Sequence, residues 1–342
     1  MYPSCTTASS TISASTGAVA SSWHPWYAGN GPQMPIQEDE TALVIWALWK
    51  HFDRHRDIEF LKLLYRPLVK AAAEFMVAYR DENGLPKPSW DLWEERFGVH
   101  AFTCAATPAG LRAAARIADF FGETDLGARY QTAADEIRAG MARHMFLEAD
   151  NRFARMLTPD GKGGYTADRT IDASLYGIWY FGTFSVHHPM VASTMQAVEE
   201  RLWVKTDVGG VARYEDDRYH QVSQDVEQVP GNPWFICTLW LAQYRIARAR
   251  TLEQLEESLP ILEWVASRTL PSGVLAEQIH PYRDQPLSVS PLTWSHATVV
   301  ATVIEYLKKL EKLVVCDTCG RPLFMHDRKV REAEGRLTKL LG

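Results

Sequence analysis

The sequence lacks a long apolar run, since it nowhere reaches the roughly 18 consecutive apolar residues that a membrane-spanning helix needs. We therefore expect no transmembrane segment and no membrane partner. It also lacks a basic face, because the net charge is −6 and the lysines and arginines are scattered through the predicted helices. That distribution argues against nucleic acid as a partner. Residues 5–22 lack the charged start and apolar centre of a signal peptide.

The sequence has few cysteines, and their number is odd. Of the five cysteines, Cys104 and Cys237 lie inside apolar helical patterns, which favours a reduced, cytoplasmic protein. Cys316 and Cys319 form a Cys-x-x-Cys pair near the C-terminus, and His326 could be a third ligand. A structural zinc ion usually takes four ligands. The sequence leaves open whether this tail binds zinc or carries two reduced thiols in a turn, and it predicts no other cofactor.

A sustained β-strand alternation is also absent. Apolar residues recur instead at every third and fourth position, which predicts an all-α chain. The predicted helices span residues 38–53, 57–80, 101–120, 123–146, 170–182, 186–204, 233–250, 253–270 and 291–312. Short connections between them alternate with long ones, which lie at 81–100, 147–169, 205–232 and 271–290. Because short connections join antiparallel neighbours, the alternation predicts that all the long loops lie at one end of the helical body.

Helices that follow a long loop are more apolar than helices that precede one. The segment PWFICTLWLA at 233–242 is apolar all round, whereas LGARYQTAADEIRAGMARH at 126–144 is charged on one face. Apolar helices are buried and amphipathic helices lie outside. The pattern therefore predicts an inner ring of helices wrapped by an outer ring, an (α/α)6 toroid.

The count of predicted helices is about nine of the twelve that such a toroid needs. Residues 1–20 have too few large apolar side chains to supply the others, so we interpret them as a disordered or wrongly assigned N-terminus. Residues 21–312 are predicted to form a barrel that is incomplete at its N-terminal side. Residues 313–342 are predicted to form the Cys-x-x-Cys turn followed by a short charged helix.

Two glutamates stand out in aromatic, polar loops. Glu94 lies in the segment SWDLWEE at 89–95, and Glu277 lies in GVLAEQ at 273–278. Glycoside hydrolysis needs one carboxylic acid to protonate the leaving oxygen and a second carboxylate to activate water or attack the sugar. Neighbouring carboxyl groups and flanking tryptophans raise a pKa, which suits Glu94 to the role of acid. The alternatives are a solvated acidic loop at 94 and a surface glutamate at 277.

Other polar and aromatic residues fall in the same kind of loop. Arg213 and Trp234 bracket the third long loop, where an arginine fork could hold sugar hydroxyls or belong to a salt-bridged loop. Gln37 and Asp39 precede the first apolar helix, where acidic residues are also ordinary capping chemistry. Trp23 lies in the segment Trp-His-Pro-Trp, and two exposed tryptophans in a loop favour a binding partner.

These segments resemble those of glycoside hydrolase family 15, the glucoamylases and their bacterial and archaeal relatives. The matches, in the family's order, are Ser-x-Asp-Leu-Trp-Glu-Glu at 89–95, Arg-Tyr at 213–214, Gly-Asn-Pro-Trp-Phe at 231–235, Glu-Gln at 277–278 and Leu-Thr-Trp-Ser at 292–295. The resemblance extends from about Ser21 to Lys312. It implies an (α/α)6 barrel and an inverting, exo-acting hydrolase that releases β-D-glucose from α-glucans or maltooligosaccharides.

The resemblance implies separate roles for the two glutamates, with Glu94 as the general acid and Glu277 as the general base. Inversion requires roughly 6.5 to 9.5 Å between their carboxyl groups. Motifs and resemblance together predict the following substrate-binding residues: Trp23, Gln37, Asp39, Asp91, Trp93, Glu95, Arg213 and Trp234. The expected partner is an oligosaccharide, and the oligomeric state is left open.

The chain departs from the family in one respect. Family members carry a Trp-x-Arg-Asp type motif between the first two barrel helices, and bacterial members have a β-sandwich domain before it; neither is in this sequence. We therefore expect an N-terminally truncated member. Two alternatives stay open: a trehalase of the same family, and an inactive fragment or non-catalytic sugar-binding remnant.

Overall fold

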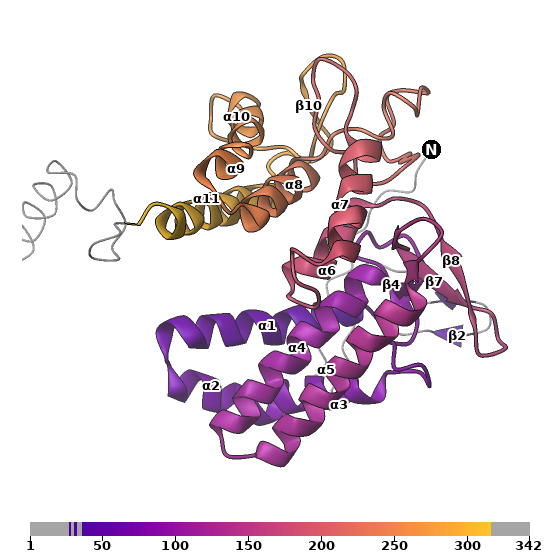
Figure 1. Ribbon diagram of the computed structural model, residues 1–342, viewed down its shortest axis with the longest axis vertical. Coiled ribbons are helices and arrows are strands. Elements are labelled where there is room, and N and C mark those ends of the chain that lie inside the picture. The colour runs from indigo at the N-terminus through magenta and orange to yellow at the C-terminus, as the bar shows by residue number, and fades with distance from the viewer. Residues whose placement is uncertain (1–26, 29–30, 33–35, 316–342) are drawn as a thin grey trace, which may run out of the picture. The chain divides into compact units, whose positions relative to one another are not determined.

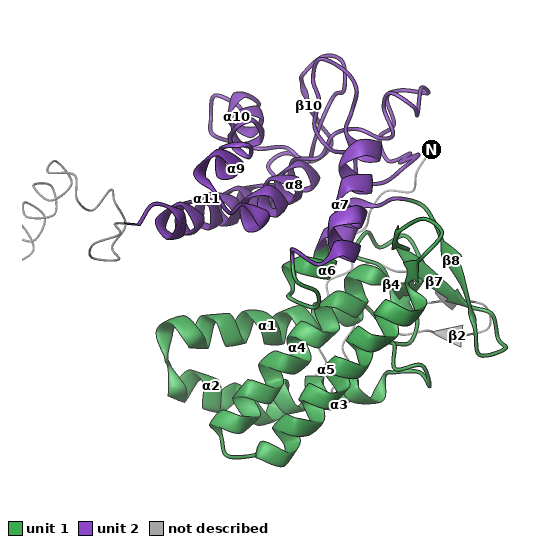
Figure 2. Cartoon of the chain, in the orientation of Figure 1, with its two compact units in different colours: residues 1–170, 177–185 green, residues 171–176, 186–342 purple. Residues whose placement is uncertain are grey.

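The computed structural model describes residues 27–28, 31–32 and 36–315 (Figure 1). The chain divides into two compact units (Figure 2). Unit 1 comprises the residues up to Thr170 together with Gly177–Ser185, and unit 2 comprises Ile171–Tyr176 and the residues from Val186 onward. The predictions for residues 1–20, Trp23 and the Cys316–Cys319 tail fall outside the described residues.

Unit 1 is mainly helical. Its helices are α1 (Glu38–His55), α2 (Ile58–Leu64), the π-helix η1 (Tyr65–Lys70), α3 (Ala71–Ala78), α4 (Ala101–Phe120), α5 (Thr124–His144) and α6 (Gly177–Tyr180). Helix α4 is buried along most of its length and packs against both α1 and α5. A Cβ atom at Gly110 would come within 2.7 Å of the Ala42 carbonyl oxygen, so only glycine allows α1 and α4 to pack this closely.

Short antiparallel strands occupy the long loops of unit 1 and the segment before α1. Strands β3 (Ser89–Trp90), β4 (Phe97–His100), β7 (Met156–Pro159) and β8 (Tyr165–Asp168) form one sheet in the order β3-β4-β7-β8. The remaining pairs are β1 (Tyr27–Ala28) with β2 (Gly31–Pro32) and β5 (Phe146–Leu147) with β6 (Arg152–Phe153). The sequence predicted none of these strands, because two to four residues are too few to produce a recognisable alternation.

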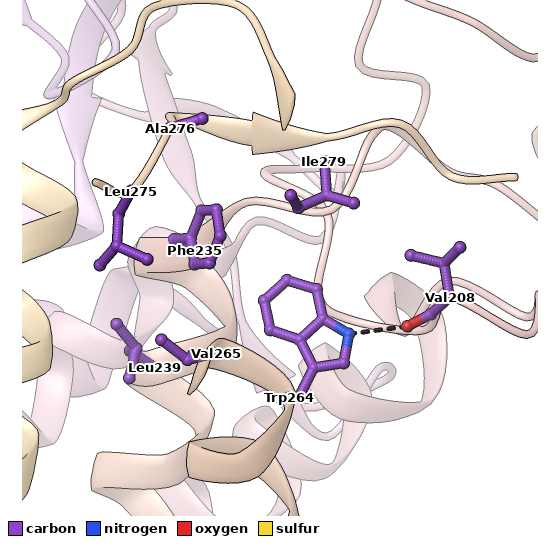
Figure 3. Packing of buried hydrophobic residues seen from close by; sticks show 8 residues of the cluster. All are labelled: Val208, Phe235, Leu239, Trp264, Val265, Leu275, Ala276 and Ile279. Carbon is purple, nitrogen blue, oxygen red and sulfur yellow. Dashed lines mark hydrogen bonds between the residues drawn. The ribbon is translucent and has the colours of Figure 1, made fainter. Parts of the chain in front are cut away.

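Unit 2 is organised around the buried helix α8. Its elements are the 3-10 helix η2 (Ala173–Tyr176), α7 (Pro189–Leu202), α8 (Phe235–Arg248), α9 (Leu252–Glu256), α10 (Leu259–Ser267), β9 (Gln278–Ile279), β10 (Pro286–Leu287) and α11 (Thr293–Leu313). Every α8 residue from Phe235 to Tyr244 is buried. Figure 3 shows Phe235 and Leu239 of α8 packed in one cluster with Trp264, whose Nε1 donates to the Val208 carbonyl oxygen at 2.7 Å.

All nine predicted helical segments are helical in the described part of the chain, and the predominantly helical fold is confirmed. Segment 57–80 contains α2, η1 and α3, and segment 253–270 is interrupted between α9 and α10. Segment 170–182 contains η2 and α6, which belong to different units. Among the helices described, none is long and apolar enough to cross a membrane.

Helix α11 follows a long loop and was therefore predicted to be one of the more apolar, buried helices, yet one of its faces is exposed. Val300 is 58% exposed and Leu307 is 51% exposed, while Ser295, Thr298 and Thr302 on the opposite side are buried. Buried threonine hydroxyls on this helix donate to its own backbone, as Thr302 does to the Thr298 carbonyl oxygen at 2.7 Å. Because their hydroxyl groups are hydrogen-bonded, these polar residues can lie on the buried face of α11. The opposite face of the helix exposes apolar residues.

Replacing Phe235 should destabilise unit 2 because the side chain is fully buried in the cluster of Figure 3. We expect Phe235→Ala to lower the free energy of unfolding by about 3 to 5 kcal/mol through lost burial and the cavity left behind. The matched control is Phe60→Ala, because Phe60 is 43% exposed; its cost should be about 1 kcal/mol or less. Urea unfolding followed by tryptophan fluorescence measures both, and equal losses would contradict this packing.

Candidate active site

Glu94 lies in the tight loop that joins β3 to β4. Trp90 pairs with Phe97 at the end of the two strands, and the Asp91 amide donates to the Arg96 carbonyl oxygen at 3.0 Å. The buried Asp91 carboxylate accepts from the backbone amides of Glu95 at 2.7 Å and Arg96 at 3.0 Å. An aspartate that accepts from amides further along its own loop acts as an internal brace. The position of Glu94 is therefore fixed by its own hairpin.

Glu94 itself has a left-handed backbone, with φ at +59°. Its amide donates to the Asp91 carbonyl oxygen at 2.9 Å, which closes the turn in which this conformation occurs. Residues other than glycine adopt this region infrequently, and such residues concentrate at functional sites. The Glu94 side chain is half-buried. Burial, followed by the negative charges of Glu40 and Asp91, raises the pKa of its carboxyl group, as a general acid requires.

The residues before and at the start of α1 lie against this loop. Gln37 Nε2 donates to the Asp91 carbonyl oxygen at 3.0 Å, so Gln37 supports the loop through its backbone. Thr103 Oγ1 of α4 donates to Asp39 Oδ1 at 2.9 Å. Burial raises the pKa of Asp39 to about 7, although the Thr103 hydrogen bond acts in the opposite direction. Both Gln37 and Asp39 are buried, and their contact with a sugar stays a prediction.

Glu38 is a buried acid that sequence reasoning did not single out. Its side chain is fully buried, and in the part of the chain that the structure describes neither carboxyl oxygen has a hydrogen-bond partner. Burial, and then the neighbouring charge of Asp39, raises its pKa well above the usual range, while Arg80 has a smaller opposite effect. No sequence pattern indicates this burial, because an acid in the first turn of a helix is ordinarily exposed.

Two other predicted residues of this loop differ in exposure. Trp93 is buried, so little of its ring is available as an open wall for a sugar. Glu95 is partly exposed and forms an ion pair with Arg96 at 2.8 Å. Unit 1 thus brings together Gln37, Asp39, Asp91, Trp93, Glu94 and Glu95.

In unit 2, Glu277 lies between the buried Ala276 and strand β9. Its amide donates to the Val289 carbonyl oxygen at 2.8 Å, and its carbonyl oxygen accepts from the Phe235 amide at 3.2 Å. The backbone of Glu277 is therefore tied to the first residue of α8. Its half-buried carboxylate accepts from Ser288 Oγ through Oε2, and Gln278 Nε2 lies 3.4 Å from the same oxygen.

Ser288 is a functional candidate that sequence reasoning missed. Its backbone has φ at +65°, in the left-handed region. The hydrogen bond to Glu277 Oε2 comes from a residue 11 positions further along the chain. No sequence motif marked this serine, because the contact depends on the turn that returns the chain to Glu277.

A buried amide network continues from Glu277. Asn232 Nδ2 donates to Gln278 Oε1 at 2.9 Å and to the His220 carbonyl oxygen at 2.8 Å. Trp234 pairs with Gln278 as an isolated antiparallel bridge. Because both amides are almost completely buried, these bonds fix the Gln278 side chain and join the loop before α8 to the loop of Glu277.

Arg213 is buried in an aromatic cage. Its Nε and Nη2 donate to the two carboxylate oxygens of Asp217 at 2.9 and 2.8 Å. The guanidinium carbon lies 4.6 Å from the ring centroid of Tyr214 and 5.1 Å from those of Tyr219 and Trp234. Arg213 is only 4% exposed, so in this structure it organises the loop, and any contact with a sugar stays a prediction. The acid four residues later was the sequence signal for this ion pair.

The predicted residues therefore fall into two groups, each held within its own unit. Arg213, Trp234 and Glu277 gather at the start of α8 in unit 2, and the Glu94 group gathers at the start of α1 in unit 1. Among the residues described, no group of three or more histidine, cysteine, aspartate or glutamate side chains is arranged to hold a metal ion.

Comparison with known proteins identifies the family. The model for glycosyl hydrolases family 15 matches residues 13–304. The chain is 31% identical over 296 residues to an uncharacterised glycosyl hydrolase of Methanocaldococcus jannaschii. This alignment covers 83% of this chain and 44% of that protein. It is 26% identical over 299 residues to a glucoamylase of Clostridium sp., covering 80% and 40% respectively. The chain thus spans less than half the length of these relatives.

Solved structures agree on the fold. The crystal structure of a bacterial glucoamylase complexed with acarbose matches 82% of this chain and 42% of its own, with a TM-score of 0.65 and 24% identity. A second match is a glucoamylase from Hypocrea jecorina, with a TM-score of 0.61 and 19% identity, covering 83% of this chain and 54% of the other. These likenesses show the (α/α)6 fold. Because the family model matches most of the sequence, the chain belongs to glycosyl hydrolase family 15.

Proposed function

We propose that this chain carries the acid–base pair of an inverting, exo-acting glycoside hydrolase that releases β-D-glucose from α-glucans or maltooligosaccharides. Glu94 is the general acid and Glu277 is the general base. The observation that carries the proposal is the contrast between their surroundings. Burial and neighbouring acids raise the pKa of Glu94, whereas the Glu277 carboxylate accepts a hydrogen bond from Ser288.

The reaction follows from this division of roles. The Glu94 carboxyl group gives its proton to the glycosidic oxygen as the bond from that oxygen to the anomeric carbon breaks. Glu277 takes a proton from a water molecule, whose oxygen bonds to the anomeric carbon from the opposite face. Attack from that face inverts the configuration, so an α-glucoside yields β-D-glucose. Room for the water requires roughly 6.5 to 9.5 Å between the two carboxyl groups.

The names of the relatives support the substrate class. The Clostridium relative is a glucoamylase, and the solved bacterial glucoamylase was crystallised with acarbose. Expressed chain should therefore release glucose from maltotriose, and NMR spectra taken immediately after mixing should show the β-anomer first. Release from trehalose but not from maltotriose would contradict the proposal and favour a trehalase.

Removing the proton donor should abolish most of the activity. We expect Glu94→Gln to lower kcat on maltotriose by about 10² to 10⁴-fold, because proton donation to the leaving oxygen is lost while the shape of the side chain is kept. Glu59→Gln on the exposed face of α2 is the matched control and should behave as wild type. If Glu94→Gln still releases glucose at the wild-type rate, Glu94 is not the acid.

Ser288 should act as a positioning residue for Glu277. We expect Ser288→Ala to lower kcat about tenfold with little change in KM, because the variant loses a hydrogen bond that orients the proposed base. Ser272→Ala, in the exposed part of the same loop, serves as the control. Steady-state kinetics on maltotriose separate kcat from KM, and a rise in KM alone would argue against positioning of the base.

The alkaline limb of the pH profile should depend on Glu40. After burial, the negative charge of Glu40 is a cause of the raised pKa of Glu94. A general acid works only while protonated, so kcat/KM should fall as pH rises through that pKa. Glu40→Gln removes the charge and lowers the pKa of Glu94, so the limb should shift to lower pH. Measured kcat/KM profiles for Glu40→Gln, Glu59→Gln and wild type test this, and a shift to higher pH would reverse the assignment.

A further inference from the structure

A surface groove of about 350 Å³ lies in unit 2, near the C-terminal end of α8 and the start of α7. The side chains that give it its chemical character are His187, Gln196, Glu199, Tyr244, Arg248 and Arg250. Neither the reaction proposed above nor the resemblance to family 15 uses any of these residues. The groove is therefore a separate feature of the surface.

Two of its arginines lack a counterion. In the part of the chain that the structure describes, no carboxylate lies within ion-pair distance of the guanidinium group of Arg248 or Arg250. Arg248 lies over the Tyr244 ring, with its guanidinium carbon 5.7 Å from the ring centroid. The acid of the groove, Glu199, is already paired with Arg245. The groove thus carries two arginine charges that no acid of its own neutralises.

Several positively charged side chains lie near His187. His187 has a lowered pKa, caused first by burial and then by the positive charges of Arg250, Lys309 and Arg248. Lys309 is held at the end of α8, where its Nζ donates to the Ala247 carbonyl oxygen at 2.8 Å. Arg248 and Arg250 line the groove together with His187, and Lys309 lies at the adjoining end of α8. Such a potential attracts an anion.

The groove is distant from the Glu277 loop. Helix α8 begins at Phe235, whose amide donates to the Glu277 carbonyl oxygen, and ends at Arg248. At about 1.5 Å per residue, a helix of this length spans about 20 Å. A neutral glucan at Glu277 carries no charge with which cations at the opposite end of this helix could pair.

We propose that this groove binds a phosphate group, either inorganic phosphate or the phosphate of a small organic monoester. Arg248 and Arg250 present planar guanidinium donors, which match phosphate oxygens better than a single ammonium does. His187 lines the same groove. Ala192, in the first turn of α7, also lines the groove, and the N-terminus of a helix favours negative charge.

Titration with two probes tests the site. Inorganic phosphate and glucose 6-phosphate are titrated separately into the full chain at constant ionic strength, with binding followed by calorimetry. We expect saturable binding with one site per chain. Tighter binding of glucose 6-phosphate would identify an organic monoester as the ligand, and equal binding would identify phosphate alone.

The decisive variant is Arg248→Gln with Arg250→Gln, which should weaken the affinity for phosphate at least about tenfold. The matched control is Arg54→Gln with Arg56→Gln, because those two arginines have the same spacing, are also exposed and also lie at the end of a helix. The control should bind as wild type. Glu277→Gln should also bind as wild type, so this test does not depend on the proposed hydrolysis.

Two results would overturn the proposal. One is the absence of saturable phosphate binding to wild type, and the other is equal affinity in wild type and in the Arg248 and Arg250 variant. Because both side chains are exposed, the variant should keep the wild-type melting temperature and circular dichroism spectrum.

Discussion

The candidate site in unit 1 depends on the hydrogen bonds that the buried Asp91 carboxylate accepts. Those bonds satisfy two backbone amides in a loop too short to pair them with carbonyl groups, and they hold Glu94 in a left-handed conformation. Removing the acceptor would leave two partly buried donors without this partner, which destabilises the loop. The loop is therefore held by hydrogen bonds among its own residues. Gln37 adds a connection from the start of α1 to the Asp91 carbonyl oxygen.

Unit 2 reaches a similar result by a different route. The aspartate of the Glu277 loop, Asp284, pairs with Arg268 and does not brace Glu277, whose backbone is bonded instead to the start of α8 and to Val289. The loop before α8 is in turn fixed by the Arg213–Asp217 ion pair. Burying such a pair is costly unless its hydrogen bonds are well formed, and the two-pronged contact with Asp217 meets that condition. In both units, a residue at or just before the start of a helix is hydrogen-bonded to the loop that carries a candidate catalytic residue.

The sequence predicts the helices well because their periodicity is a property of the packed helix itself. The prediction of 101–120 coincides with α4, whose buried face extends over nearly its whole length. Segment 253–270 is interrupted because Pro260 lies at the first positions of α10, where proline favours the start of a helix rather than its continuation. The β3–β4 hairpin was not predicted, since its strands are too short to show a pattern.

The site could be predicted only in part, for a related physical reason. Glu94 and Glu277 were identified from the aromatic and polar residues beside them in the sequence. The roles of Asp91 as an internal brace and Ser288 as a partner of Glu277 depend on backbone turns that spacing does not encode. Arg213 was predicted to face a sugar, and its burial against Asp217 and three aromatic rings depends on how the loop folds back on itself.

At the start of α1, burial raises the pKa values of two acidic residues. Glu38 and Asp39 are the first two residues of α1, where exposed carboxylates would interact favourably with the helix dipole. Instead both are buried, and burial is the largest cause of the raised pKa of each, as it is for Asp91 and Glu94. A pKa that is raised on folding stabilises the folded state at low pH, and this contribution is lost as pH rises through the folded value. For Asp39 that window extends from its ordinary value of 3.8 to about 7. The buried acids at the start of α1 thus destabilise the folded state least when they are protonated, and Glu94 likewise can donate a proton only in its protonated form.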